Sequence, residues 1–272
     1  MSDSITVNVN ERPYDAASGT SLFELRAAVK PDADVLILNG APAVQDCLLK
    51  NGDAVTFIRR GEMPSMDELE GLITARHTPG VHQRLKSAKV GIAGLGGLGS
   101  NIAVALARIG VGTLVLADFD VVEPSNLNRQ QYFVDQIGML KTEALTSTLK
   151  RTNPYITIET YPVRLTRANI SSIFGAVDIL AEAFDRAEEK AMLIETAIKH
   201  FPRKPIVAAS GLAGYESANR IITQKARQNL YVCGDGESAA RPGHGLMAPR
   251  VGVAAHHQAN VIMRLILGEE DP

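Results

Sequence analysis

The stretch that decides the fold runs from Val90 to Asp118 and reads VGIAGLGGLGSNIAVALARIGVGTLVLAD. An apolar run leads into a glycine-rich loop, a helical segment follows, and a second apolar run ends in an aspartate. The loop contains Gly94, Gly96, Gly97 and Gly99. Glycines let a backbone approach phosphates, and the amino end of a helix attracts their negative charge. The pattern therefore predicts a β-loop-α-β unit that binds a nucleotide.

Strand and helix patterns continue to alternate after this unit. Strands are predicted at 89–93, 113–118, 156–160, 177–181 and 205–209, with two more near 220 and 230. Helices are predicted at 100–109, 138–151, 167–174, 187–200 and 251–267. Such alternation is typical of a mostly parallel sheet with helices on both faces. We therefore expect a Rossmann-like α/β domain.

A smaller unit precedes this domain. Residues 4–11 alternate between apolar and polar, and a second short strand, a helix at 22–29 and strands at 35–38 and 54–58 follow. The helix has a candidate N-cap at Ser21, and Asn39-Gly40 is a turn signal. This order suits a small β-grasp sheet. We expect three segments: a β-grasp domain at 1–60, a linker with a short helix at 61–75, and the α/β domain at 76–272.

Composition narrows the classes of partner. The 28 basic and 30 acidic residues leave a net charge of -2, which favours neither nucleic acid nor an anionic membrane surface. The amino-terminal sequence lacks the basic and apolar regions of a signal peptide, and no apolar run is long enough to span a membrane, so we expect a cytoplasmic protein. Cys47 and Cys233 are too far apart in sequence to build a CxxC zinc site.

The loop after Asp118 carries the more specific chemistry. It reads DFDVVEPSNLNRQ over 118–130 and includes Asn126 and Arg129; Lys141 and Asp185 follow downstream. In α/β folds, residues at the carboxyl ends of parallel strands meet where ligands bind. A dehydrogenase would use Asp118 for a ribose but would have no use for the two cations and the further aspartate. A nucleotidyl transferase would use all of them, although Asp185 could also serve as a helix N-cap.

With these motifs in view, the chain resembles the ThiF/MoeB/HesA family of carrier-protein adenylyltransferases, which is related to ubiquitin-activating enzymes. The resemblance covers about 76–268. It implies that Asp118 binds the ribose of ATP, that Arg129 and Lys141 hold the triphosphate, and that Asp185 coordinates Mg²⁺. It also places Asn126 in the same site, beside the glycine loop.

The resemblance further implies a reaction. ATP and Mg²⁺ would adenylate the C-terminal glycine of a separate ThiS-like sulfur-carrier protein, in thiazole formation for thiamine, and the enzyme would form a homodimer. The attacking carboxylate is already ionised at neutral pH, so no general base is needed. The two CxxC pairs with which many family members bind zinc are missing here, so we expect no zinc site. Cys233 is the one candidate for sulfur or acyl chemistry, and the alternative interpretation is a structural cysteine that is partly buried.

The amino-terminal unit resembles ThiS itself. A working carrier ends in Gly-Gly with a free carboxylate, whereas the matching tail here reads Arg59-Arg60-Gly61-Glu62 and continues into the enzyme. We therefore expect a degenerate carrier that is not the substrate and that serves docking, dimer contact or regulation.

Three alternatives stay open at this point. An NAD-dependent oxidoreductase would account for the glycine loop and Asp118. A non-catalytic carrier-binding protein would account for the fused domain. Within the same family, a small carboxylate or an RNA-linked threonine could replace the protein tail as the group that is activated.

Overall fold

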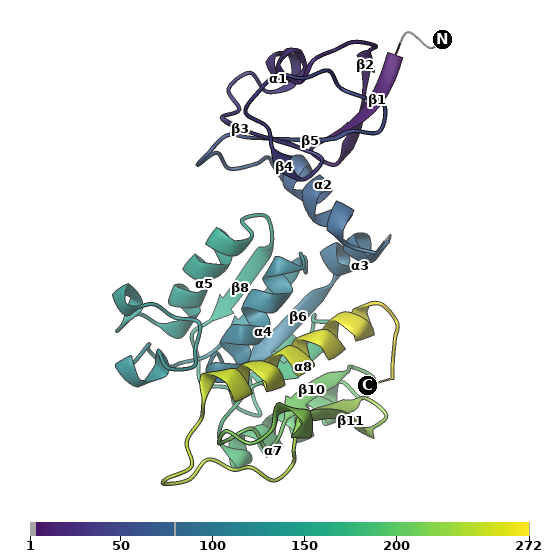
Figure 1. The fold of residues 1–272 in the computed structure, drawn as a ribbon. Coiled ribbons are helices and arrows are strands. Elements are labelled where there is room, and N and C mark those ends of the chain that lie inside the picture. Colours follow the sequence, from purple (N-terminus) through teal and green to yellow (C-terminus); the bar gives the residue numbers. More distant parts are fainter. Residues whose placement is uncertain (1–3, 79, 272) are drawn as a thin grey trace. The chain divides into compact units, whose positions relative to one another are not determined.

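The computed structural model describes residues 4–78 and 80–271, and the chain divides into two compact units, Met1–Pro79 and Gly80–Pro272. Each unit has its own sheet and its own buried core (Figure 1). Among the helices in the described ranges, none combines the length and the apolar character that crossing a membrane requires.

The first unit is a five-stranded sheet with one helix packed on it. Its elements are β1 (Ser4–Val9), β2 (Arg12–Ala17), α1 (Leu22–Val29), β3 (Val35–Leu38), β4 (Ala41–Pro42), β5 (Ala54–Ile58) and α2 (Met66–Arg76). The strand order is β2-β1-β5-β3-β4, and β1 runs parallel to β5 at the centre. Val7, Leu25 and Phe57 are buried in its core. This is the expected β-grasp fold.

Local signals in the sequence account for much of this unit. Ser21 caps α1: its hydroxyl accepts a hydrogen bond from the Glu24 N–H, and the Glu24 carboxylate accepts one from the Ser21 N–H. Asn39-Gly40 forms a two-residue turn with positive φ at both positions, which suits a tight hairpin. That hairpin adds β4, a strand absent from the sequence prediction because two exposed residues leave no readable periodicity.

The second unit is a seven-stranded sheet between two layers of helices. Its strands are β6 (Lys89–Ala93), β7 (Thr113–Ala117), β8 (Thr157–Tyr161), β9 (Ile179–Glu182), β10 (Ile206–Ala209), β11 (Ile222–Arg227) and β12 (Leu230–Gly234). Its helices are α3 (Val81–Ser87), α4 (Gly97–Arg108), α5 (Lys141–Thr152), α6 (Ile170–Phe174), α7 (Ala187–His200) and α8 (Ala248–Ile266). The strand order is β11-β12-β10-β9-β6-β7-β8, and only the β11–β12 pairing in it is antiparallel. The predicted Rossmann-like fold is therefore confirmed.

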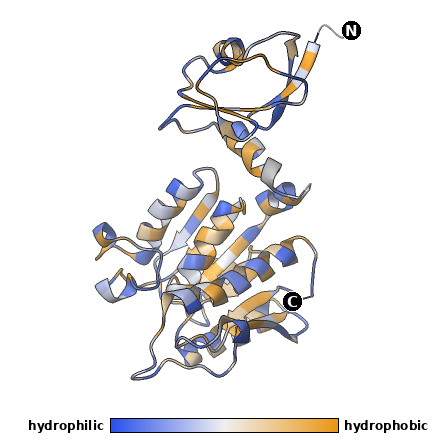
Figure 2. Ribbon diagram, in the orientation of Figure 1, coloured by the Kyte–Doolittle hydropathy of each residue, from blue (hydrophilic) through white to orange (hydrophobic). Residues whose placement is uncertain are grey.

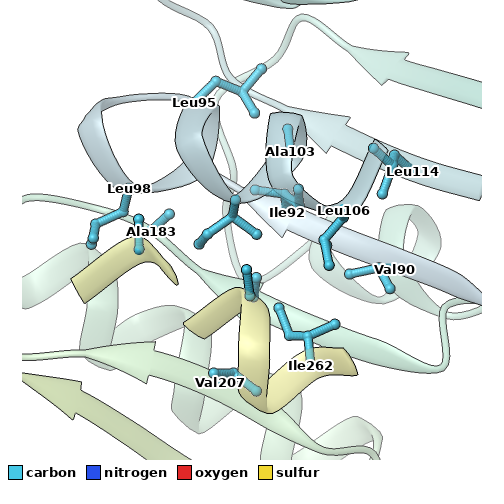
Figure 3. Close-up of a cluster of buried hydrophobic side chains, with 14 of the residues drawn as sticks. Val90, Ile92, Leu95, Leu98, Ala103, Leu106, Leu114, Ala183, Val207 and Ile262 are labelled. Carbon is cyan, nitrogen blue, oxygen red and sulfur yellow. The ribbon is translucent and has the colours of Figure 1, made fainter. Parts of the chain in front are cut away.

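The two faces of this sheet bury separate cores. Helices α4, α5 and α8 cover one face, and Figure 3 shows side chains of β6, α4 and α8 converging there. Helices α6 and α7 cover the other face around Phe174 and Leu193. Apolar and hydrophilic residues alternate along α8, as a helix with one buried side requires (Figure 2). Because both faces are covered, ligands have access mainly at the ends of the strands.

Helix starts differ most from the sequence prediction. Helix α4 begins at Gly97 rather than at 100, so Gly97 and Gly99 lie in its first turn. Helix α5 begins at Lys141 rather than at 138, since Gly138 has a φ of 87° that a helix cannot contain. Helix α8 begins at Ala248, three residues early, because a proline is well tolerated in the first turn.

Gly99 provides a test of how this fold is built. A Cβ added there would lie 1.9 Å from the Gly94 carbonyl oxygen, whereas a Cβ at Gly252, inside α8, would meet nothing within 4 Å. We expect Gly99→Ala to lower the free energy of unfolding by about 1–3 kcal/mol through overpacking. Gly252→Ala should raise it by about 1 kcal/mol through helix propensity. Chemical denaturation of both variants checks this, and equal effects would contradict the packing described here.

Candidate active site

A cleft of about 590 Å³ lies at the carboxyl ends of β6, β7, β9 and β10. These strands are parallel, so the segments that follow them share one edge of the sheet. Of the residues singled out in the sequence, those that line the cleft are Gly94, Gly96, Gly97, Asp118, Arg129, Lys141 and Asp185. The structure thus brings the glycine loop, the two cations and both aspartates to one place.

The glycine loop turns sharply from β6 into α4. Gly94 has a φ of 91°, and a Cβ on it would lie 2.9 Å from the Ala183 carbonyl oxygen at the end of β9. Gly99 is not among the lining residues; its role is the close approach of α4 to Gly94. The amino end of α4 is consequently directed at the cleft, where its N–H groups favour an anion.

Asp118 holds this loop from the neighbouring strand. One carboxylate oxygen accepts a hydrogen bond from the Leu95 N–H at 2.6 Å, and the other accepts one from the Asp120 N–H at 2.8 Å. Burial raises the pKa of Asp118, and the nearby charge of Lys141 acts in the opposite direction. Asp118 therefore ties the glycine loop to the end of β7 on the wall of the cleft.

Lys141 is a buried cation and not an exposed one. It is the first residue of α5, its side chain is 8% exposed, and its ammonium nitrogen lies 2.9 Å from an Asp120 carboxylate oxygen. The Lys141 N–H also donates to the Asp120 carbonyl oxygen at 2.9 Å. Asp120, which is half exposed, therefore orients the lysine at the cleft wall. Sequence reasoning did not give Asp120 a role, because the two residues are 21 positions apart and their pairing depends on tertiary packing.

Arg129 and Asn126 belong to the same loop but face different surroundings. The Arg129 guanidinium donates to the Ser125 carbonyl oxygen at 3.2 Å and to the Asn128 side chain at 2.8 Å. Its Nε is buried and, among the described residues, has no hydrogen-bond partner. Asn126 does not line the cleft. Its side-chain oxygen accepts from the Glu123 N–H at 3.1 Å, so it shapes the loop that carries Arg129.

Asp185 lies exposed on the turn between β9 and α7. The capping role that the sequence left open is not seen, because Arg186 is the N-cap residue and no side-chain hydrogen bond caps the helix. Within the described part of the chain, the Asp185 carboxylate has no hydrogen bond or ion pair. It is therefore available to a ligand that enters the cleft.

The opposite wall is held by a buried ion pair between Arg250 and Asp235. Their closest nitrogen and oxygen lie 2.5 Å apart, and both side chains are almost fully buried. Arg250 also donates to the carbonyl oxygens of Glu216 and Ser217. Burial acts to raise the pKa of Asp235, but hydrogen bonds from Ser238 and Glu237 and the charge of Arg250 outweigh it and hold the pKa well below 3.8. The pair anchors the loop around 235–238 that leads into the cleft lining.

Two further features of the cleft were not predicted. The Arg164 guanidinium lies 4.4 Å from the centroid of the Phe119 ring and 3.2 Å from a Glu189 carboxylate oxygen. All three residues line the cleft; they come from the loop after β7, the loop after β8 and helix α7. Lys190, on α7, also lines it. These residues are far apart in sequence, so only the fold reveals their proximity.

Cys233 lies in β12 and is not among the residues that line the cleft. It is fully buried, and burial raises the pKa of its thiol to about 11, partly offset by the Thr223 hydroxyl. A thiol in this state is a poor nucleophile at neutral pH. This environment favours the structural interpretation over sulfur or acyl chemistry.

Comparison with protein families agrees with this geometry. Residues 72–272 match the ThiF family, and residues 5–61 match the ThiS-like ubiquitin family. The chain therefore belongs to the ThiF family and carries a ThiS-like ubiquitin domain at its amino end.

Individual relatives and solved structures add detail. The chain is 33% identical over 192 residues to the adenylyltransferase and sulfurtransferase UBA4 of Eremothecium gossypii. The aligned region covers 68% of this chain but only 43% of that relative. The tRNA N6-threonylcarbamoyladenosine dehydratase TcdA of E. coli, solved with ATP, superposes with a TM-score of 0.68 at 20% identity over 76% of this chain and 98% of TcdA. That likeness shows the fold. E. coli MccB, solved with AMPCPP and MccA, gives a TM-score of 0.55 at 25% identity over 71% of this chain and 59% of MccB.

The Asp235–Arg250 pair predicts a specific pH dependence. A carboxylate whose pKa is depressed in the folded state stabilises the fold above its unfolded pKa and loses that contribution as the pH falls. We expect Asp235→Asn to lower the unfolding temperature at pH 7 and the difference from the wild type to shrink steadily below pH 3.8. Calorimetric scans across this range measure it, with Asp135→Asn as an exposed control. A difference that does not change with pH would contradict the assignment.

Proposed function

We propose that this protein is an ATP-dependent adenylyltransferase that activates the C-terminal glycine of a ThiS-like carrier protein supplied by a separate chain. The observation that carries the proposal is the convergence of Arg129, Lys141 and Asp185 on the cleft that the glycine loop opens. An NAD-dependent oxidoreductase would use the glycine loop and Asp118, but its reaction gives no function to these three charged groups.

The chemistry follows from the charges in the cleft. A carboxylate oxygen of the carrier tail attacks the α-phosphorus of ATP, the bond to the bridging oxygen breaks, and pyrophosphate leaves. Negative charge builds up on the phosphate oxygens, where Lys141 and Arg129 lower the barrier by electrostatic preorganisation. Asp118 aligns the ribose and the α4 amino end receives phosphate oxygens, which reduces the reaction to a positioned displacement.

Asp185 suits a magnesium ion in this scheme. Mg²⁺ is usually bound through one or two protein carboxylates together with substrate phosphates. Within residues 4–78 and 80–271, no three His, Cys, Asp or Glu side chains gather as a complete metal cage would require. A single unpartnered carboxylate beside the phosphate-binding loop fits an ion that arrives with ATP. Such an ion would neutralise charge on the departing pyrophosphate.

The fused ThiS-like domain is proposed as a non-substrate. Its tail turns back on its own unit: the Lys30 ammonium lies 2.6 Å from the Glu62 carboxylate, and Arg59 pairs with Asp32 at 2.5 Å. Gly61 lies inside this turn, with its carbonyl bonded in the chain and not free as a carboxylate. The carrier that is adenylated must therefore come from another chain, and the fused domain serves docking, dimer contact or regulation.

The cellular setting is the finer part of the proposal. We further propose that the protein acts in sulfur transfer for the thiazole of thiamine, as a cytoplasmic homodimer; the fused ThiS-like domain supports the sulfur-transfer part of this proposal. UBA4, the relative described above, bears the name of a sulfurtransferase as well as an adenylyltransferase. Growth of a deletion strain with and without added thiazole, together with the molecular mass of the purified protein in solution, tests this part separately from the chemistry.

Exchange of labelled pyrophosphate into ATP tests the reaction. With a Gly-Gly-ended carrier present, we expect Lys141→Ala to lower the exchange rate by about 100-fold or more, as removal of a preorganised cation does. Lys150→Ala, at the exposed end of the same helix, is the matched control and should exchange at the wild-type rate.

Two further measurements accompany the exchange assay. A carrier that lacks its last glycine should give no exchange. Calorimetry should detect binding of ATP in the presence of Mg²⁺ but no binding of NAD. Exchange that continues unchanged in Lys141→Ala, or a wild type that fails to exchange with every Gly-Gly-ended carrier, would refute the proposed reaction.

The fused tail is tested by Gly61→Ala. The φ of 76° at this position makes the substitution locally strained, but a Cβ there meets nothing within 4 Å, so the unit should still fold. We expect exchange with a separate carrier to stay at the wild-type rate, because Gly61 is not the acceptor. Strong exchange without any added carrier, abolished by Gly61→Ala, would show instead that the fused tail is the substrate.

A further inference from the structure

Glu182 is a fully buried carboxylate on β9, the central strand of the seven-stranded sheet. It ends β9, between β6 and β10, and its side chain is 0% exposed. Desolvation raises its pKa, and the charge of Lys190 opposes that effect. A buried charge is costly unless it is paired and hydrogen-bonded, so a specific arrangement must hold it there.

That arrangement centres on the backbone of one residue, Phe184. One Glu182 carboxylate oxygen lies 2.5 Å from the Lys190 ammonium nitrogen, and the other accepts a hydrogen bond from the Phe184 N–H at 2.7 Å. The Lys190 ammonium also donates to the Phe184 carbonyl oxygen at 3.4 Å. The pair therefore hydrogen-bonds the backbone of Phe184 at both its N–H and its C=O.

The residue that follows Phe184 is Asp185. Its carboxylate has no partner among the described residues, so its direction depends on the backbone of the turn that carries it. Gln258, on α8, also donates to the Glu182 carbonyl oxygen at 2.9 Å and fixes the start of that turn. Lys190 is 22% exposed and lines the cleft, so the clamp reaches the site directly.

We propose that Glu182 and Lys190 are positioning residues that clamp the backbone of Phe184 on both sides and so aim the carboxylate of the next residue, Asp185, at a divalent cation bound with a nucleotide. The cation part rests on the proposed function; the clamp itself does not. Replacing groups that orient a metal ligand typically weakens metal binding by about 10–100-fold.

The test uses variants that remove the clamp without leaving a buried charge alone. Glu182→Leu combined with Lys190→Met replaces the pair by apolar side chains of similar size, an exchange that folds tolerate. Glu182→Gln combined with Lys190→Met keeps an acceptor for the Phe184 N–H and serves if the first variant does not fold. Lys190→Arg keeps the charge, and Lys199→Met, at the exposed end of α7, is the matched control.

Two readouts separate the clamp from the reaction. Hydrogen exchange of the amides at 183–186 should become about 10-fold faster or more in the apolar double variant, and not in Lys199→Met. Electron paramagnetic resonance of free Mn²⁺, with a non-hydrolysable ATP analogue at saturation, should show about 10-fold weaker binding in both double variants and near wild-type binding in Lys190→Arg.

The outcomes point to different failures. Unchanged amide exchange and unchanged Mn²⁺ affinity in a folded double variant would overturn the clamp. Faster amide exchange with unchanged Mn²⁺ affinity would overturn the aiming of Asp185. If the wild type shows no pyrophosphate exchange, the proposed function is contradicted. The clamp is then tested by the amide hydrogen exchange alone.

Discussion

The site depends on one close approach, in which the first turn of α4 packs on the Gly94 carbonyl with no room for a side chain at Gly99. That contact brings the amino end of the helix to the edge of the sheet directly after β6. Asp118 then ties the loop to β7 through the Leu95 N–H, so the ends of β6 and β7 and the start of the helix are joined in one corner. Every charged group proposed for the chemistry is placed relative to this corner.

Features that depend on neighbours in sequence were predictable. The Gly94–Gly99 spacing, the Ser21 cap and the Asn39-Gly40 turn each encode a local geometry, and the alternation of strands and helices encodes the parallel sheet. The cleft residues after β7 were predictable because they follow a strand end, where the topology requires a ligand site. What the sequence prediction missed were exact bounds and the shortest element: the starts of α4, α5 and α8, and the two-residue strand β4, whose exposed residues show no periodicity.

The same distinction applies within the cleft. Sequence reasoning placed Lys141 in the site from its motif but could not show that Asp120 would orient it, because that pairing depends on how α5 packs beside the β7 loop. The Arg250–Asp235 and Lys190–Glu182 pairs are likewise invisible in a linear pattern. Each joins a helix to a strand end or a loop beyond one. The motif residues thus identify the site, while long-range ion pairs determine its shape.

The pairing of Lys141 with Asp120 also explains how the protein accommodates a nearly buried ammonium group in the wall of the cleft. Asp120, whose side chain is half exposed, offsets the charge of the lysine and so weakens the field that the ammonium exerts in the cleft. In the proposed reaction, a phosphate of ATP would compete with Asp120 for the same ammonium, so its affinity would reflect the difference between two partners and not the full attraction of an unpaired charge. In that scheme, a carboxylate beside the cation would weaken anion binding and so allow pyrophosphate to leave readily.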